Sequence, residues 1–333
     1  MSRKKITELV RKDGAGLVLA ILLGLVAYWA ASYDQAIDSL VVGLIFGMIV
    51  RTIMGDRRLF LPGFDLAPKI FIPLGVVFYG INLKFNRLIE IPAIIWLQLV
   101  VAIIAIFTVA IYLGRLLKIR DRNSLLIATG TAICGASAIA ITTPVVKADS
   151  EEASTSLIVI TIFGLLGLLV YPLVTIYFAF TTTQYAALCA TTLHMTGIVK
   201  AAALALGEGC LRLALSIKMA RTALIIPIIG FLYWYRERGR DIRKKRNVLL
   251  RIPWFMWVFV LVGLLTSFVP GLSPVLLALK PWAGIFFTMA LTSVGLSVDL
   301  RKMLNVGGAP LVVGLVCWLI AIAIFILISY SYA

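Results

Sequence analysis

The chain has 333 residues, of which 62% are hydrophobic and only 14% are charged. A soluble domain is about half apolar and about a quarter charged, so this composition excludes a soluble globular protein and indicates an all-α polytopic membrane protein. The net charge of +16 would suggest a nucleic-acid partner for a soluble protein, but basic cytoplasmic loops explain it here, and we expect no nucleic-acid partner.

Hydropathy predicts about eleven transmembrane helices in a single membrane domain, residues 1–333. A helix needs about 20 predominantly apolar residues to cross the bilayer. The predicted spans, in chain order, are 15–33, 36–52, 68–83, 91–114, 124–146, 154–180, 185–206, 213–235, 252–269, 281–299 and 309–331.

Basic residues set the expected orientation. They gather in the N-terminal segment 1–13, in alternate loops after it and above all in the loop 236–251. Because cytoplasmic loops are enriched in lysine and arginine, this pattern places the segment 1–13 and the loop 236–251 in the cytoplasm and the C-terminus outside. Strict alternation of the spans then leaves few charged residues on the outer side, namely Lys84, Arg87, Lys147, Lys280, Asp149, Glu151 and Glu152.

Two segments, residues 78–85 and 292–300, weakly resemble each other. Each places a glycine and a polar residue near the end of a span, followed by a charge. Structural repeats are common in transporters, so the similarity favours an inverted-repeat architecture in which Asn82 and Asp299 line the substrate cavity or a coupling-ion site. Chance similarity between apolar helices is the alternative.

The segment 127–147 is too apolar for a loop and too rich in glycine for an ordinary spanning helix. Its interruptions are Gly130, Thr131, Gly135, Ser137 and Pro144. Broken helices at membrane depth are tolerated only in cavities or inside protein, and transporters bind substrates there. We expect a break over residues 130–137, where a restarting helix and two hydroxyl groups would offer donors to an anion. Close packing of small residues is the alternative interpretation.

A second polar patch lies in the predicted span 185–206. His194 stands among threonines, and Lys200 follows near the middle of the span. Histidine titrates near neutral pH, so His194 is a candidate ligand or carrier of a coupled proton, although a hydrogen bond between helices is the simpler alternative. A lysine in a span costs at least about 2.5–3.5 kcal/mol unless a partner satisfies it, which makes Lys200 a candidate anion ligand.

Lys218 and Arg221 enter the predicted span 213–235 three residues apart, so they share one helix face. The spans contain too few acidic residues to pair with them, and no carboxylate stands out at mid-membrane as cation/proton exchange would require. A bound anion is therefore an economical partner for this pair. The alternative is that both side chains extend along their alkyl stems to the membrane surface.

Several chemistries find no support in the sequence. The four cysteines lie in or beside apolar segments without metal-ligand spacing, and the chain has one histidine, so we expect free thiols and no metal site. The phosphate-binding motif G-x-x-x-x-G-K-[ST] does not occur, so we do not expect the chain to hydrolyse ATP, and we expect no cofactor.

Four motifs stand out: G-T-A-I-C-G-A-S-A-I-A at 130–140, P-V-V-K-A at 144–148, I-K-M-A-R at 217–221 and V-G-L-S-V-D-L-R-K at 294–302. Together they resemble the YeiH-like sulfate exporter family of bacterial and archaeal membrane proteins, over most of the chain. The resemblance implies a ten- or eleven-helix fold distantly similar to bile-acid symporters, with crossed broken helices at its centre. It also implies export of a small sulfur oxyanion or sulfonate across the plasma membrane. The chain departs from the family pattern after the histidine, at Met195, Gly197 and Ile198.

We therefore predict a secondary carrier, not an enzyme, that exports a small inorganic or organic anion such as sulfate, sulfite or a sulfonate. The half-helix at 130–137 would hold the anion, the cations Lys200, Lys218 and Arg221 would neutralise it, and His194 would carry the coupled proton. The expected partners are this anion and the lipid bilayer, and a homo-oligomer is compatible with the sequence.

Two other functions stay open at this point. A sodium-coupled symporter of an organic solute would bind sodium on the polar backbone around Gly130 and Asp299. An intramembrane serine protease would need a serine activated by a histidine, and Ser137 and His194 would form that pair. The number of spans and the unused basic residues argue against the protease.

Overall fold

The computed structural model describes residues 3–33, 39–55, 60–82, 91–178, 180–237, 254–269, 271–297 and 307–329, and every regular element in these ranges is a helix. The first half contains α1 (Arg3–Ala31), α2 (Ser39–Met54), α3 (Leu61–Tyr79), the short η1 (Gly80–Asn82), α5 (Ala93–Leu116), α6 (Asp121–Ala132), α7 (Ala136–Val146) and α8 (Ser150–Tyr177). The second half contains α9 (Thr182–Thr192), α10 (Thr196–Leu204), α11 (Glu208–Ala223), α12 (Ile225–Glu237), α13 (Trp254–Phe268), α14 (Ser273–Ala278), α15 (Pro281–Ser297) and α17 (Ala309–Ser329).

Apolar length explains most of these helices. Seven segments of the described ranges are long and apolar enough to cross a bilayer, namely Gly14–Ala31, Leu61–Asn82, Ala93–Leu116, Ser150–Val174, Glu208–Tyr235, Pro274–Ser297 and Ala309–Ser329. The prediction of an all-helical membrane protein is confirmed. The predicted count of about eleven spans is confirmed only in part, because two of the predicted spans each divide into two short helices.

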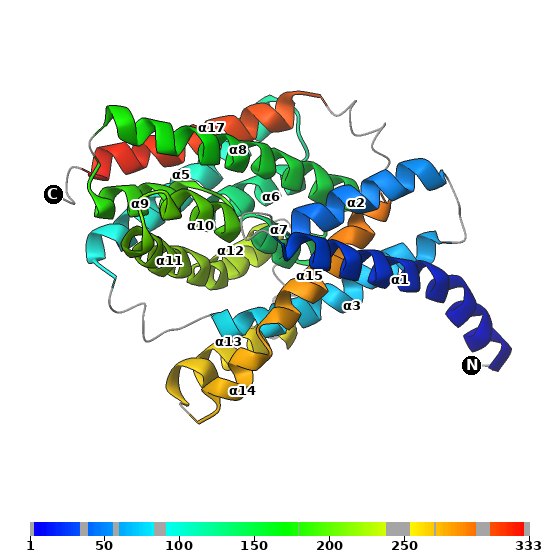
Figure 1. Cartoon of the computed structure of the whole chain (residues 1–333). Helices are drawn as coiled ribbons and strands as arrows, with labels where there is room; N and C mark the ends of the chain where they lie inside the picture. Colours follow the sequence, from blue (N-terminus) through cyan, green and yellow to red (C-terminus); the bar gives the residue numbers. More distant parts are fainter. Residues whose placement is uncertain are drawn as a thin grey trace.

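The helices form two groups that lie side by side (Figure 1). The first group contains α1, α2, α3 and α13–α15, and the second contains α5–α12 and α17. Glycines bring α2 and α15 into close contact, because a Cβ atom at Gly47 would overlap the Thr292 carbonyl oxygen and one at Gly295 would overlap the Leu44 carbonyl oxygen. Such small-residue contacts are a common basis of helix association in membranes.

The predicted span 124–146 is a hairpin that leaves the membrane on the side where it entered. We call residues 121–146 hairpin 1; it consists of α6, a turn at 133–135 and α7. Nη1 of Arg122, at its start, donates a hydrogen bond of 2.8 Å to the Lys147 carbonyl oxygen just beyond its end. Gly130 of α6 packs against Ile139 of α7, as antiparallel arms require. The prediction that this segment crosses the bilayer is therefore wrong.

The predicted span 185–206 is a second hairpin, so this predicted crossing is wrong too. Hairpin 2, residues 182–204, consists of α9, a turn at 193–195 and α10. The Tyr185 hydroxyl, near its start, donates a 3.1 Å hydrogen bond to the Ala202 carbonyl oxygen near its end. The four arms have nine to twelve residues and are only about 14–18 Å long, so each hairpin reaches about the middle of a bilayer about 30 Å thick.

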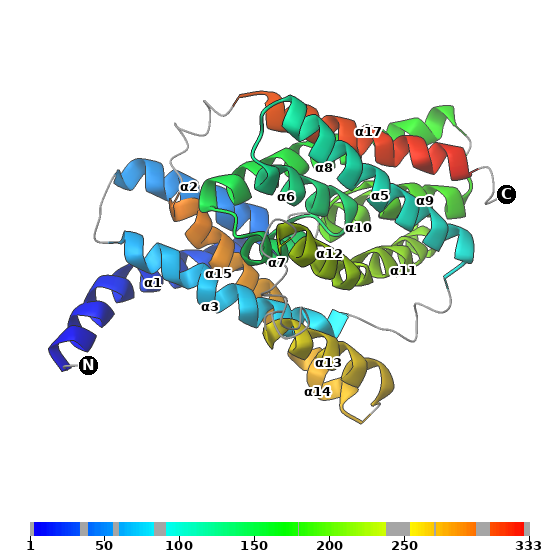
Figure 2. The same cartoon turned by 180° about the vertical axis from the view of Figure 1, so that it is seen from behind.

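The two hairpins are attached to opposite ends of the long helix α8 (Figure 2). Hairpin 1 ends where α8 begins, and hairpin 2 begins where α8 ends. With 28 residues α8 is about 42 Å long, which is enough to cross the bilayer. Each hairpin returns to its own side, so the number of crossings falls by two. An even change keeps the alternation of the other spans, and the loop 236–251 and the C-terminus stay on the sides that the charge pattern predicts.

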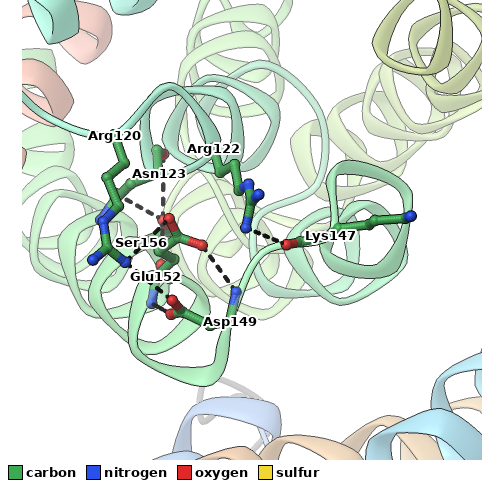
Figure 3. A network of polar contacts seen from close by, with 7 residues as sticks. All are labelled: Arg120, Arg122, Asn123, Lys147, Asp149, Glu152 and Ser156. Atoms are coloured by element: carbon green, nitrogen blue, oxygen red, sulfur yellow. Dashed lines mark hydrogen bonds and ion pairs between the residues drawn. The ribbon is translucent and has the colours of Figure 1, made fainter. Parts of the chain in front are cut away.

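Polar contacts hold the open end of hairpin 1 against the start of α8 (Figure 3). Nη1 of Arg120 lies 3.1 Å from a carboxylate oxygen of Asp149 and 3.8 Å from one of Glu152. The Ser156 hydroxyl lies 3.1 Å from the side-chain oxygen of Asn123. Lys147, Asp149, Glu151 and Glu152 therefore lie on the same side as Arg120 and Arg122, which corrects the prediction that the span 124–146 separates them.

Cysteine labelling from one side of the membrane tests this topology. All four native cysteines are buried, so the background should be low. Lys118, Glu151 and Thr182 are exposed, which makes each a suitable site for a single introduced cysteine. We expect an impermeant maleimide to label Lys118→Cys and Glu151→Cys from one side and Thr182→Cys from the other. Labelling of Lys118→Cys and Glu151→Cys from different sides would refute hairpin 1.

Candidate functional site

The tips of the two hairpins meet in the middle of the second helix group. Gly135 in the tip of hairpin 1 has φ of +74° and ψ of −124°, a conformation that favours glycine. A Cβ atom there would lie 2.9 Å from Cγ of Met195 and 3.1 Å from the backbone carbonyl carbon of His194. The break that the sequence predicts over 130–137 is therefore confirmed, and it lies against a second break at 193–195.

Lys218 of α11 binds both tips. Its Nζ donates hydrogen bonds to the carbonyl oxygens of Ile133 at 3.0 Å, Leu193 at 2.9 Å and His194 at 2.7 Å. The side chain is only 2% exposed. Lys218 therefore joins hairpin 1 to hairpin 2 from inside the protein.

Arg221 does the same one helical turn further along α11. Its Nε donates to the Ala132 carbonyl oxygen at 2.7 Å, and one Nη donates to those of Ala190 at 3.0 Å and Leu193 at 2.7 Å. The other Nη contacts the Thr131 carbonyl oxygen. The side chain is 1% exposed. The prediction that Lys218 and Arg221 share a face is confirmed, and the alternative that they extend to the membrane surface is wrong.

Lys218 and Arg221 bind these carbonyl groups because α6 and α9 end here. The last carbonyl groups of a helix have no partner within the helix, and its C-terminal end carries partial negative charge. Both helices end among buried residues, where unpaired carbonyl groups are costly. The cations therefore serve as internal caps of two helices. Their hydrogen-bond partners are backbone groups, where the sequence alone favoured a bound anion.

The carbonyl groups pair with the three donors of Lys218 and with four of the five donors of Arg221, but they do not cancel the charge. Carbonyl groups are dipoles, so the formal charge of the pair stays on the two side chains. Within the described part of the chain, no carboxylate lies within ion-pair distance of either residue. The meeting point of the hairpins is therefore a buried centre of positive charge.

The helices that restart after the tips begin without side-chain caps. Gly135, the N-cap of α7, has no side chain, and Met195, the N-cap of α10, makes no side-chain cap hydrogen bond. Two helices that begin at the surface differ, because α8 and α9 each begin with a capping box, built by Asp149 with Glu152 and by Thr181 with Gln184. Amide groups in the first turns of α7 and α10 are therefore potential donors to a ligand.

Ser137 and Thr196 lie in the first turns of these two helices. Both are only partly buried, although they belong to a region whose other residues are mostly buried. The sequence singles out Ser137, whereas Thr196 is one of several threonines around His194. Two helix N-termini with adjacent hydroxyl groups can bind an anion through several hydrogen bonds at once.

Three further residues that the sequence predicts at the anion site are Gly130, Thr131 and Lys200. Gly130 packs against Ile139 and Ile160, so it serves the packing of hairpin 1. Thr131 contributes its carbonyl group to Arg221, while its hydroxyl is buried without a hydrogen-bond partner among the described residues. Lys200 lies on α10, partly buried, and the described hydrogen bonds and ion pairs do not join it to the tips.

His194 is fully buried in the tip of hairpin 2. Neither ring nitrogen has a hydrogen-bond partner in the described structure, and Nδ1 lies beside Gly164 of α8. The predicted hydrogen bond between helices is therefore not formed by this ring. The structure also leaves Ser137 and His194 without the mutual hydrogen bond that a catalytic pair requires.

The two predicted coupling residues in the segments 78–85 and 292–300 lie apart from the tips or outside the described residues. Asn82 ends η1, where its amide donates to the Tyr79 carbonyl oxygen at 3.3 Å. Asp299 lies outside the described residues, as does most of the loop 236–251. Tyr79, which the sequence did not single out, ends α3 with its side chain beside Cys134 and Ser137.

Comparison with known proteins places the chain among membrane proteins. The model of the family described as conserved hypothetical protein 698 matches residues 15–314. The chain is similar to a UPF0324 membrane protein of Archaeoglobus fulgidus, with 30% identity over 96% of this chain and 94% of the relative. It is also similar to UPF0324 membrane proteins of Streptococcus agalactiae, at 28% identity over 91% of this chain and 93% of the relative, and of Fusobacterium nucleatum, at 27% over 91% and 93%. No solved structure matches the chain.

Proposed function

The chain belongs to the family of conserved hypothetical protein 698, whose compared members are membrane proteins, and we propose that it is a secondary carrier of small anions. The favoured substrates are sulfate, sulfite and sulfonates, and the favoured direction is export across the plasma membrane of a bacterium or archaeon. The resemblance to YeiH-like sulfate exporters supports the sulfur oxyanion class. The N-terminus would be cytoplasmic and the C-terminus outside, in keeping with the basic residues of the loop 236–251.

The observation that carries this proposal is the buried positive charge of Lys218 and Arg221 without a carboxylate partner among the described residues. A charge within the membrane marks a substrate or ion pathway more often than a structural detail. At roughly 6 Å and an effective dielectric constant of about 20, one unit charge attracts a monovalent anion by about 3 kcal/mol. Two such charges offset much of the cost of removing a small anion from water.

The anion would bind at the N-termini of α7 and α10. Their free amide groups and the hydroxyls of Ser137 and Thr196 would donate the hydrogen bonds, while Lys218 and Arg221 would contribute charge from behind the tips. Lys200 lies one turn after Thr196 on α10 and would extend the positive path toward the open end of hairpin 2. His194, in the tip of hairpin 2, would carry a coupled proton, because histidine is the side chain that ordinarily titrates near neutral pH.

The two hairpins also support an inverted-repeat architecture. They enter from opposite ends of α8 and meet tip to tip, which is the arrangement expected when two halves of opposite orientation share one central site. Alternating access would then expose this site to one side of the membrane at a time. A carrier of this kind would not be an enzyme and would need no cofactor, since transport requires only binding and a change of conformation.

Exchange of radiolabelled sulfate in proteoliposomes tests this function. We expect saturable exchange, competed by sulfite and by taurine, that changes when a pH gradient is imposed. Ser137→Ala and Thr196→Val each remove one donor to the anion, so each should raise the half-saturating concentration roughly tenfold, as the loss of a hydrogen bond to a charged group does.

Thr108→Val is the matched control for the loss of a hydroxyl. Its hydroxyl donates to the Ile104 carbonyl oxygen within α5 and lies outside the tips, so exchange should stay as in the wild type. Failure of the wild-type protein to exchange sulfate, sulfite and taurine under either pH gradient would refute the anion proposal and favour a sodium-coupled carrier.

A further inference from the structure

The ammonium group of Lys218 lies in a cage of carbonyl oxygens that two separate hairpins build. Three oxygens surround Nζ at 2.7–3.0 Å, one from the tip of hairpin 1 and two from the tip of hairpin 2. Three acceptors need three donor hydrogens, and a lysine has three only in its charged form. The cage therefore binds a monovalent cation, and that cation is covalently attached to α11.

The same chemistry binds dissociable ions in other membrane proteins. Rings of carbonyl oxygens replace the hydration shell of a monovalent cation in selectivity filters. In transporters with discontinuous helices, unwound carbonyl groups and the C-terminal ends of half-helices coordinate the coupling cation. The cage of Lys218 has both features, because its oxygens belong to the turns that end α6 and α9.

We propose that Lys218 fills a monovalent-cation site between the hairpin tips, so that the protein keeps the tips together without sodium, potassium or any other dissociable cation there. The site itself does not depend on the identity of the transported solute. Its consequence for coupling rests on the proposed transport function: exchange should be independent of sodium, because the place of a coupling cation is already occupied.

Truncation of Lys218 should turn the filled site into an empty one. Lys218→Ala removes the ammonium group and most of its stem but leaves the three carbonyl groups, which lack another described side-chain donor except at Leu193. Ammonium ions supply the same donor group, and potassium ions suit carbonyl cages. The unfolding temperature of the purified variant in detergent should fall, and ammonium or potassium chloride should raise it saturably by roughly 5 °C over choline chloride at equal ionic strength.

Lys218→Met is the matched control, because its unbranched side chain keeps the space filled but offers no donor. Its unfolding temperature should fall as well, without recovery in ammonium or potassium. The wild-type protein should show the same unfolding temperature in sodium, potassium and choline chloride, since its site is occupied.

Two results would overturn the proposal. One is a Lys218→Ala variant that no monovalent cation stabilises more than it stabilises Lys218→Met. The other is a wild-type protein whose unfolding temperature depends on sodium or potassium, and this measurement decides the matter even if Lys218→Ala cannot be purified. Neither readout uses transport, so a failure here is distinct from a failure of the anion proposal. Sodium-dependent exchange with a cation-independent unfolding temperature would overturn only the consequence for coupling.

Discussion

Replacement of Arg221 by methionine is expected to destabilise the protein strongly and to abolish anion exchange. The guanidinium group binds four carbonyl groups, and three of them, at Thr131, Ala132 and Ala190, have no other described side-chain donor. A buried polar group without a partner costs about 1–3 kcal/mol, so we expect a loss of about 3 kcal/mol or more. That loss should lower the unfolding temperature by roughly 4 °C or more in a chain of 333 residues.

Two further variants separate charge from hydrogen-bonding geometry. Arg212→Met removes an exposed arginine from the same helix and should leave the unfolding temperature nearly unchanged. Arg221→Lys keeps the charge but replaces a planar fork of five donors by a compact group of three, so it should recover stability only in part. If Arg221→Met unfolds at the temperature of Arg212→Met, the capping role of Arg221 is wrong.

Replacement of Gly135 by alanine is expected to have the second large effect. The backbone there has φ of +74°, which costs a residue with a side chain about 1–3 kcal/mol. The new Cβ would also lie 3.1 Å from the His194 carbonyl carbon, and a backbone atom yields less readily than the flexible side chain of Met195. The tips should move apart, and displaced donors should lower the exchange rate by at least about tenfold.

Gly207→Ala is the matched control for backbone strain. Gly207 also has a positive φ, of +90°, but a Cβ atom there would meet nothing within 4 Å. This variant should lose stability from strain alone and keep its exchange rate. Equal exchange by Gly135→Ala and the wild type would show that close approach of the tips is not needed for transport.

The sequence predicts the helical class and the break over 130–137, but not the second break at 193–195 or the course of the chain through either. Glycines and hydroxyl side chains at mid-span indicate the break near Gly135, whereas the polar patch around His194 predicts a site within a continuous span. A hydropathy window cannot distinguish one helix of 22 residues from two arms of half that length, because both have the same composition. The contact between Arg122 and Lys147 decides the matter, and it depends on the tertiary structure.

The candidate site is predicted in the same partial way. The spacing of Lys218 and Arg221 places them on one face, and their burial follows from the apolar span. Their partners are carbonyl groups, which every residue possesses, so the sequence carries no signal for them. The sequence therefore assigns the missing partner to a bound anion. The sequence also assigns Gly130 to the anion, because close helix packing and close approach of a ligand both require a small residue.

The dependence of both tips on α11 has a consequence for synthesis of the protein. The contacts of Lys218 and Arg221 with hairpin 1 link residues 85–90 positions apart, whereas those with hairpin 2 link residues 24–31 positions apart. Hairpin 1 therefore leaves the ribosome long before the side chains that cap it. A nascent chain that ends before residue 218 holds two hairpins with open helix ends. Completion of α11 is thus the step of biogenesis at which both hairpins acquire their native positions together.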